Sequence, residues 1–246
     1  MLVRTGKEAV TQIADRIKKE LSKKEINAIK GSISLGFVTK ENFEEDIERI
    51  LKTAEEKMYK DKTGNRKLTN FKMIDDLMKT LHKRSEREKT HSINVSRIAE
   101  LIAIEMKLPE KEVRKIADAA YYHDIGKIVL DERLLKKDTS LNDNDKIEKE
   151  KHPLVGYRIL NLFDHTIDLA EGVLYHHEHW DGSGYPNGIT CNAIPLVARI
   201  IKVAEVYETM INVDKMEKSQ ALAEIKKQAG NKLDPDIAEV LVNIKS

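Results

Sequence analysis

The chain has 246 residues, 40% of them hydrophobic, and its 43 Lys and Arg nearly balance its 42 Asp and Glu at a formal net charge of +1. This length suits one large or two small globular domains, and the balanced charge excludes the broad basic face that binds duplex nucleic acid. A single Cys191, the lack of a long apolar run and the lack of a signal-peptide core exclude a disulfide framework and a membrane span, and they predict a cytoplasmic protein.

The first 67 residues predict a small α/β segment. Apolar residues at helical spacing predict helices over Glu8–Leu21 and Phe43–Tyr59. Alternating polar and apolar residues predict a half-buried strand over Ile29–Val38, and a short apolar stub at the N-terminus predicts another. Turn-forming residues at Lys60–Lys67 are expected to end the second helix. Because two strands make a marginal sheet, they indicate pairing with a second copy of the chain as a homodimer.

Two motifs in this segment carry a resemblance, Gly31-Ser-Ile-Ser-Leu-Gly-Phe37 and Ala54-Glu-Glu-Lys-Met-Tyr-Lys-Asp-Lys-Thr-Gly-Asn-Arg66. Together they resemble the C-terminal half of a GGDEF diguanylate cyclase domain. In that family the signature turn stands directly before a strand like Met1-Leu-Val-Arg4. The resemblance therefore implies that the residues binding GTP and metal are absent and that the segment has no cyclase activity. The alternative is an unrelated capping subdomain.

From Leu68 onward the sequence predicts helices. Apolar periodicity and helix-start signals place them at Phe71–Leu81, His91–Met106, Leu108–His123, a helix opening near His152, Ile167–His177, Pro195–Met210, Ala221–Gln228 and Pro235–Ile244. Loops are expected at Asp138–Asp145 and Gly182–Ile194. The expected fold is mainly α, with a helical bundle at residues 68–246 preceded by the α/β segment at residues 1–67.

The stretch Tyr121–Lys127 places His123 next to Asp124 at the end of an apolar helical run. A carboxylate at the edge of a core requires a cation or several hydrogen bonds, and Gly126 is expected to stop the helix just beyond the pair. For this pair alone, a core histidine with a capping aspartate is the simpler interpretation. The positions of the other histidines favour a metal site instead.

Five of the eight histidines fall where metal ligands would be needed: His91, His123, His152, His176 and His177. The adjacent imidazoles of His176 and His177 are costly to place together unless both are neutral. The neutral imidazole is also the form that binds metal. Glu205 lies on the apolar face of its helix, where a bare carboxylate would be expensive. Imidazole and carboxylate ligands without thiolates favour Fe, Mn, Zn or Ni.

These ligands and Asp124 together exceed what one hydrolytic ion needs, so they predict two ions about 3.5–4 Å apart. Asp124 is the expected bridge, because a carboxylate offers two oxygens. A hydroxide held between the ions would be the nucleophile, since coordination lowers the pKa of water. Lys127, one turn after His123, is expected to neutralise a phosphate oxygen in the transition state; the alternative is an ordinary surface lysine.

Four motifs closely resemble one family. They are His123-Asp-Ile-Gly-Lys127, His152-Pro-Leu-Val-Gly156, His176-His-Glu-His-Trp-Asp-Gly-Ser-Gly-Tyr-Pro186 and Ile194-Pro-Leu-Val-Ala-Arg-Ile-Ile-Lys-Val-Ala-Glu-Val-Tyr207. From about residue 68 onward the chain thus resembles the HD-GYP family of the HD phosphohydrolase superfamily. The resemblance implies a binuclear, in some members trinuclear, centre of iron or manganese that hydrolyses a cyclic dinucleotide, usually cyclic di-GMP, to the linear dinucleotide or GMP. It also implies that one ion is held by His91, His123, Asp124 and Glu205, and the other by Asp124, His152, His176 and His177.

The chain departs from this family at three places. Glu205 stands where aspartate is usual, which moves the ligand by one methylene. Arg87 replaces the glutamate that ligates a third metal, four residues before the first histidine, so we expect two ions. The family's Arg-Pro-Tyr-Arg-like segment, which is linked to phosphate binding, is replaced by Asn212–Lys218. Lys215 or Lys218 would have to substitute for it, without the bidentate fork of arginine.

The loop at residues 179–186 supplies further candidates for substrate binding. Trp180 and Tyr185 could stack on a guanine, and His179 could face the substrate. Loop aromatics more often anchor a loop to the core, and this interpretation stays open beside the functional one.

The expected function is hydrolysis of a cyclic dinucleotide, above all cyclic di-GMP, in signal transduction, with GGDEF-domain proteins as partners. One alternative is a non-catalytic regulatory module that binds metal or nucleotide and signals through protein partners, which Glu205 and the lost arginine segment favour. Another is a mononuclear nucleotidase, disfavoured because it leaves His152, His176 and His177 unexplained. Metal analysis and incubation with cyclic dinucleotides would separate these three functions.

Overall fold

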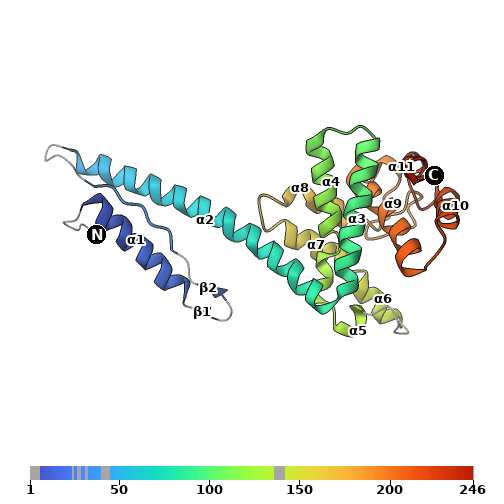
Figure 1. Ribbon diagram of the computed structural model, residues 1–246, viewed down its shortest axis with the longest axis horizontal. Helices are drawn as coiled ribbons and strands as arrows, with labels where there is room; N and C mark the ends of the chain where they lie inside the picture. The colour runs from blue at the N-terminus through green and yellow to red at the C-terminus, as the bar shows by residue number, and fades with distance from the viewer. Residues whose placement is uncertain are drawn as a thin grey trace. The chain divides into compact units, whose positions relative to one another are not determined.

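The computed structural model describes residues 6–23, 25–26, 29–30, 33–39, 45–135 and 142–245. The chain divides into two compact units, Met1–Met73 and Ile74–Ser246 (Figure 1). No helix among the described residues is both long enough and apolar enough to cross a membrane. The mainly helical fold predicted from the sequence is confirmed, because helices form almost all of the regular structure described in both units.

The first unit contains α1 (Lys7–Ser22), two antiparallel strands of two residues each, β1 (Glu25–Ile26) and β2 (Ile29–Lys30), and the beginning of α2 (Ile47–Arg84). Helix α1 confirms the predicted helix at Glu8–Leu21. The predicted strand Ile29–Val38 is wrong beyond β2, since residues 33–39 form no strand. These residues pack against α2 instead: a Cβ added to Gly36 would lie 2.0 Å from the carbonyl oxygen of Ala54. The apolar stub at residues 2–3 and the strand expected there lie outside the described residues.

The predicted helix end at Lys60–Lys67 is wrong. Helix α2 runs without a break to Arg84, so it joins the predicted helices Phe43–Tyr59 and Phe71–Leu81 into one element; residues 43 and 44 lie outside the described ranges. A single glycine costs only about 1 kcal/mol in a helix interior. Around Gly64 the chain is rich in lysine, glutamate and methionine, which favour helix, so the turn-forming residues do not stop it.

The second unit is a bundle centred on three helices: α3 (Glu86–Glu105), α4 (Glu110–Tyr122) and α9 (Leu196–Glu208). Helices α3 and α4 lie side by side (Figure 1), and α9 packs against α3. Around them lie η1 (Ile125–Val129), α5 (Glu132–Leu135), α6 (Asp143–Lys149), α7 (His152–Leu160), α8 (Ile167–Leu174), η2 (Cys191–Ala193), α10 (Lys218–Gln228) and α11 (Pro235–Lys245). A π-helical turn, η3 (Thr209–Val213), continues α9.

Local sequence explains where these helices begin. Helix α3 starts after Ser85, whose hydroxyl accepts a hydrogen bond from the amide of Glu88 at 3.2 Å, as N-cap residues do. The predicted loop Asp138–Asp145 is wrong at its end, because Asn142 and Asp145 form a capping box that starts α6. Residues 136–141 lie outside the described ranges. The predicted loop Gly182–Ile194 is irregular apart from the short turn η2.

The core of the second unit joins apolar side chains from all of its main helices. Fully buried examples are Leu81, Ile102, Ile116, Leu160, Ile201 and Leu241. Burial of such side chains stabilises a fold by about 1.5–3 kcal/mol each. This core fixes the ends of α4, α7, α8 and α9, where the histidines and carboxylates predicted from the sequence stand.

Candidate metal centre

Segments from five parts of the chain deliver the predicted ligands to one place. His91 lies in α3, His123 and Asp124 follow α4, His152 opens α7, His176 and His177 follow α8, and Glu205 lies in α9. Their ligand atoms form three overlapping groups in which all atoms lie within 4.8 Å of one another: His91, His123 and Glu205; His123, Asp124 and His176; and His152, His176 and His177. The structure therefore brings together the residues that the sequence predicted as ligands, although they span more than a hundred positions of chain.

Gly126 brings two of these segments together. A Cβ at this position would lie 2.0 Å from the carbonyl oxygen of His152, so only glycine lets η1 approach the start of α7 this closely. Asp124 Oδ1 consequently lies 3.1 Å from His152 Nε2. The prediction that Gly126 stops the helix is wrong, because α4 ends at Tyr122 and Gly126 lies inside η1.

Three histidines are oriented in the same way by the backbone. Nδ1 of His123, His152 and His176 lies 2.6–2.7 Å from the carbonyl oxygen of the residue three positions earlier. A carbonyl oxygen only accepts hydrogen bonds, so each Nδ1 carries a hydrogen and each ring turns its Nε2 toward the centre. This backbone support is the arrangement that orients histidines bound to metal ions.

The Nε2 atoms of three histidines then lie close to one another. Nε2 of His152 lies 3.2 Å from Nε2 of both His176 and His177. Burial and the neighbouring imidazoles lower the pKa of His176 and His177 well below the ordinary value, so both rings stay neutral. Imidazole nitrogens gathered this closely offer a set of donors that a metal cation can bind.

Three further buried atoms point to the same chemistry. His123 Nε2, Asp124 Oδ1 and Glu205 Oε2 are buried and have no hydrogen-bond partner among the described residues. Despite full burial, His123 and Lys127 hold the pKa of Asp124 well below its ordinary value, so it is a carboxylate. Against the effect of burial, Asp124 and Glu205 raise the pKa of His123 to about 9, which shows that this spot favours positive charge. A site with these nitrogen and oxygen donors fits divalent metal ions.

Lys127 is held inside the centre. Its Nζ lies 2.6 Å from Asp124 Oδ2 and 3.1 Å from Glu88 Oε2, and its side chain is 22% exposed. Burial opposes the charge of Lys127, but the two carboxylates raise its pKa above the ordinary value. The alternative of an ordinary surface lysine is therefore wrong, while its predicted action on phosphate stays a prediction.

Glu208 is a residue of the centre that the sequence reasoning missed. It is buried, and its Oε2 accepts a hydrogen bond from Nδ1 of His91 at 2.6 Å. Its Oε1 accepts from the side-chain amides of Asn94 and Asn212 at 3.4 and 3.3 Å. These contacts, led by the hydrogen bond of His91, lower the pKa of Glu208 against the effect of burial. The sequence did hold a signal, because Glu208 follows Glu205 by one helical turn on the same face.

The loop after His177 places its two aromatic residues differently. The Tyr185 ring stacks on His177 with centroids 4.7 Å apart, and burial together with Glu205 and Asp124 raises the pKa of its hydroxyl. Trp180 instead lies under the guanidinium of Arg199, 5.7 Å from the ring centroid. Tyr185 thus borders the centre, whereas Trp180 anchors the loop as the structural interpretation expected.

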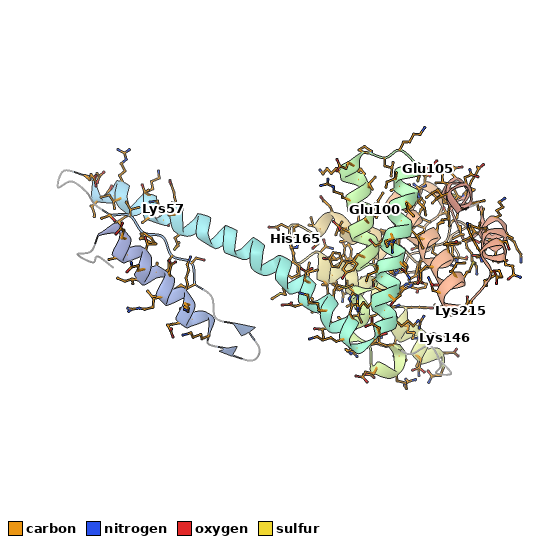
Figure 2. All side chains as sticks on the ribbon, in the orientation of Figure 1. Lys57, Glu100, Glu105, Lys146, His165 and Lys215 are labelled. Carbon is orange, nitrogen blue, oxygen red and sulfur yellow. The ribbon has the colours of Figure 1, made fainter. Side chains whose placement is uncertain are left out.

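The remaining candidates for substrate binding are His179, Lys215 and Lys218. His179 Nδ1 lies 2.8 Å from the hydroxyl oxygen of Ser183 within the loop. Lys218 opens α10, and Lys215, labelled in Figure 2, belongs to the exposed stretch before it. In the described part of the chain, no hydrogen bond or ion pair joins either lysine to the histidines. The cavity beside His91 is lined by Arg87, Thr90, His91, Glu208, Asn212 and Val213.

Comparison with known proteins identifies relatives of this chain. A family model described as HD domain matches residues 69–237. The chain is 35% identical over 154 residues to the cyclic di-GMP phosphodiesterase response regulator RpfG of Xanthomonas campestris pv. campestris, covering 60% of this chain and 41% of that protein. It is 32% identical over 183 residues to the cyclic di-GMP phosphodiesterase of Thermotoga maritima, covering 71% and 49%. The chain thus spans half or less of the length of these relatives.

The fold of the second unit also has solved counterparts. The crystal structure of a cyclic GMP-AMP specific phosphodiesterase of V. cholerae matches with a TM-score of 0.56 at 21% identity, over 70% of this chain and 47% of that one. At this identity the likeness shows the fold alone. The predicted HD-type helical bundle is confirmed by it.

Proposed function

The chain belongs to the HD domain family, and we propose that it hydrolyses a cyclic dinucleotide, above all cyclic di-GMP, at a centre of two divalent metal ions. The observation that carries this proposal is the convergence of imidazole lone pairs and buried carboxylate oxygens that lack other partners. The relatives named as cyclic di-GMP phosphodiesterases support the substrate class. Iron or manganese are the proposed ions, with zinc or nickel as the alternatives.

One ion is assigned to His91, His123, Asp124 and Glu205, and the other to Asp124, His152, His176 and His177. The three groups of ligand atoms support this division, because Asp124 and His123 belong to the group that links the other two. When bound, two such ions supply Lewis acidity toward a phosphate and lower the pKa of water to make it a nucleophile at neutral pH.

The protein's own residues orient and complete this centre. Lys127 donates to Asp124 Oδ2, which leaves Oδ1 free of hydrogen bonds and directed at the histidines. Glu208 fixes the ring of His91, so its Nε2 lies 3.6 Å from Asp124 Oδ2. The positive charge of Lys127 is available to stabilise charge that develops on a phosphate oxygen. Tyr185 covers His177 with its ring and offers an apolar face to a base.

The finer assignments follow the sequence motifs. We assign residues 68–246 to the HD-GYP subtype through the loop at residues 176–186, and residues 1–67 to the C-terminal half of a GGDEF domain. GGDEF-domain proteins and a second copy of the chain are the proposed partners. Light scattering should then report a dimer, and a monomer would contradict the proposed pairing with a second copy.

Anaerobic purification followed by metal analysis tests the proposal. We expect about two metal ions per chain, and conversion of cyclic di-GMP or cyclic GMP-AMP to the linear dinucleotide, detected by chromatography. Reduced metal must be used, because an oxidised di-iron centre could be inactive for that reason alone. Metal binding without turnover of either nucleotide would refute the enzyme and support the regulatory module, which Glu205 and the lost arginine segment favour.

A further inference from the structure

A cavity of 330 Å³ lies between the first turn of α3 and the π-helical turn η3. It borders the metal centre through His91, whose Nε2 lies 3.6 Å from Asp124 Oδ2. Two of its lining residues, Arg87 and Asn212, come from these two elements. Its size is within the range of ligand-binding cavities in proteins.

Most polar groups of this cavity are already paired. His91 and Glu208 bond to each other at 2.6 Å, the Thr90 hydroxyl donates to the carbonyl oxygen of Glu86, and Asn212 donates an amide hydrogen to Glu208. Arg87 differs, because its guanidinium has no hydrogen bond or ion pair among the residues that the structure describes. Its fork of N–H donors is therefore available to a ligand.

Two further cations, Lys127 and Lys149, lie near Arg87. Burial lowers the pKa of Lys149, and the positive charges of Lys127 and Arg87 lower it further, so these three cations lie near one another. Lys127 is balanced by Asp124 and Glu88, whereas neither Arg87 nor Lys149 has an ion pair in the described part of the chain. The carboxylates of Glu88 and Asp145 act on Lys149 in the opposite direction. Arg87, which has no ion pair among the described residues, is therefore the cation at this cavity that can bind an anion.

We propose that this cavity binds the second phosphate of a cyclic dinucleotide, with Arg87 as its bidentate ligand. The inference rests on the proposed function and extends it. A cyclic dinucleotide carries two phosphodiesters, and while one lies at the metal ions the other still needs a partner for its charge. Arg87 stands one helical turn before His91, close to the centre but not part of it. A guanidinium suits this role because its planar fork matches two phosphate oxygens.

Binding of cyclic di-GMP to metal-free protein, measured by titration calorimetry in the presence of a chelator, tests Arg87 without turnover. Loss of one charge-assisted pair predicts that Arg87→Ala raises Kd about 10- to 100-fold, with Arg87→Lys in between. The matched control is Arg97→Ala, an exposed arginine of the same helix outside the cavity. An equal loss for Arg97→Ala, an unchanged Kd for Arg87→Ala, or no binding by the wild type would overturn the proposal.

Hydrolysis by the metal-loaded protein separates this proposal from the function on which it rests. Arg87→Ala should raise KM for cyclic di-GMP by a similar factor and leave the hydrolysis of bis(p-nitrophenyl) phosphate, which has a single phosphodiester, and the metal content unchanged. Binding that depends on Arg87 without any turnover would refute the function but keep the phosphate site. Turnover with an unchanged KM in Arg87→Ala would refute the site alone.

Discussion

Replacing Glu208 should weaken metal binding, although Glu208 itself is not one of the proposed metal ligands. Its Oε2 accepts from His91 Nδ1 at 2.6 Å, and its Oε1 accepts from Asn94 and Asn212. The carboxylate thereby fixes both the tautomer and the ring orientation of His91. Loss of such a supporting group lowers metal affinity about 10- to 100-fold. We expect the loss in Glu208→Ala to be about 100-fold.

The isosteric variant Glu208→Gln should also be impaired. Glutamine has one oxygen for three donors, so either His91 or the two asparagine amides would meet an NH₂ group. An unsatisfied buried donor costs about 1–3 kcal/mol. We therefore expect the unfolding free energy of the metal-free protein to fall by about this amount and the metal affinity to fall roughly tenfold.

Competition with a chromophoric chelator measures the metal affinity, and urea unfolding of the metal-free protein measures stability. Glu105→Gln, at the exposed end of α3 (Figure 2), is the matched control and should change neither. If both Glu208 variants kept the wild-type metal affinity while they lost stability, Glu208 would be a purely structural residue. The orienting role given to it here would then be refuted.

Three other outcomes are expected. Chelation should lower the thermal midpoint of the second unit, because ions at 100 times their Kd stabilise a fold by about 2.7 kcal/mol; a midpoint independent of metal would contradict the centre. Gly126→Ala should displace His152, since the new Cβ would lie 2.0 Å from the carbonyl oxygen of His152. We expect urea unfolding to show a loss of about 1–3 kcal/mol, and a variant as stable as the wild type would show that η1 moves aside freely. The hydrogen bond from Arg133 lowers the pKa of Asp145, so its contribution to stability is full above the unfolded-state pKa and disappears as pH falls through the folded-state pKa. The stability difference between wild type and Asp145→Asn should therefore shrink in acid, and a difference that stays constant from neutral to acid pH would contradict this linkage.

The cluster of candidate ligands could be predicted because metal chemistry limits residue type, whereas the groups that support these residues could not. A histidine beside an aspartate, or a pair of adjacent histidines, is unusual in a core unless a metal ion or hydrogen bonds stabilise these polar groups. Glu208 carries no such mark, since its importance comes from His91, which lies 117 positions earlier. The backbone carbonyls that fix three of the imidazoles are invisible in a sequence for the same reason.

Loop and helix boundaries were harder to predict because they depend on distant contacts. From the sequence, Trp180 and Tyr185 are equally good candidates for stacking on a base. In the structure, Glu178 Oε1 accepts hydrogen bonds from the backbone amides of Asn187 and Gly188, and these bonds set the path of the loop. That path carries Tyr185 onto His177 and leaves Trp180 beside Arg199. The turn signals near Gly64 failed differently, because helix propensity on both sides outweighed one glycine.

Two of the differences from the usual family motifs, Glu205 and Arg87, lie beside the centre, and both are on the side of His91. Glu205 shares a group of ligand atoms with His91 and His123, and Arg87 lines the cavity beside His91. The opposite group of His152, His176 and His177 keeps the pattern of the HD-GYP family. A longer carboxylate and an unpaired guanidinium lie on the same half of the centre. Any preference of this protein for a particular ion or dinucleotide should therefore arise there, and exchanging Glu205 for Asp should shift metal affinity while leaving the contacts of His152 intact.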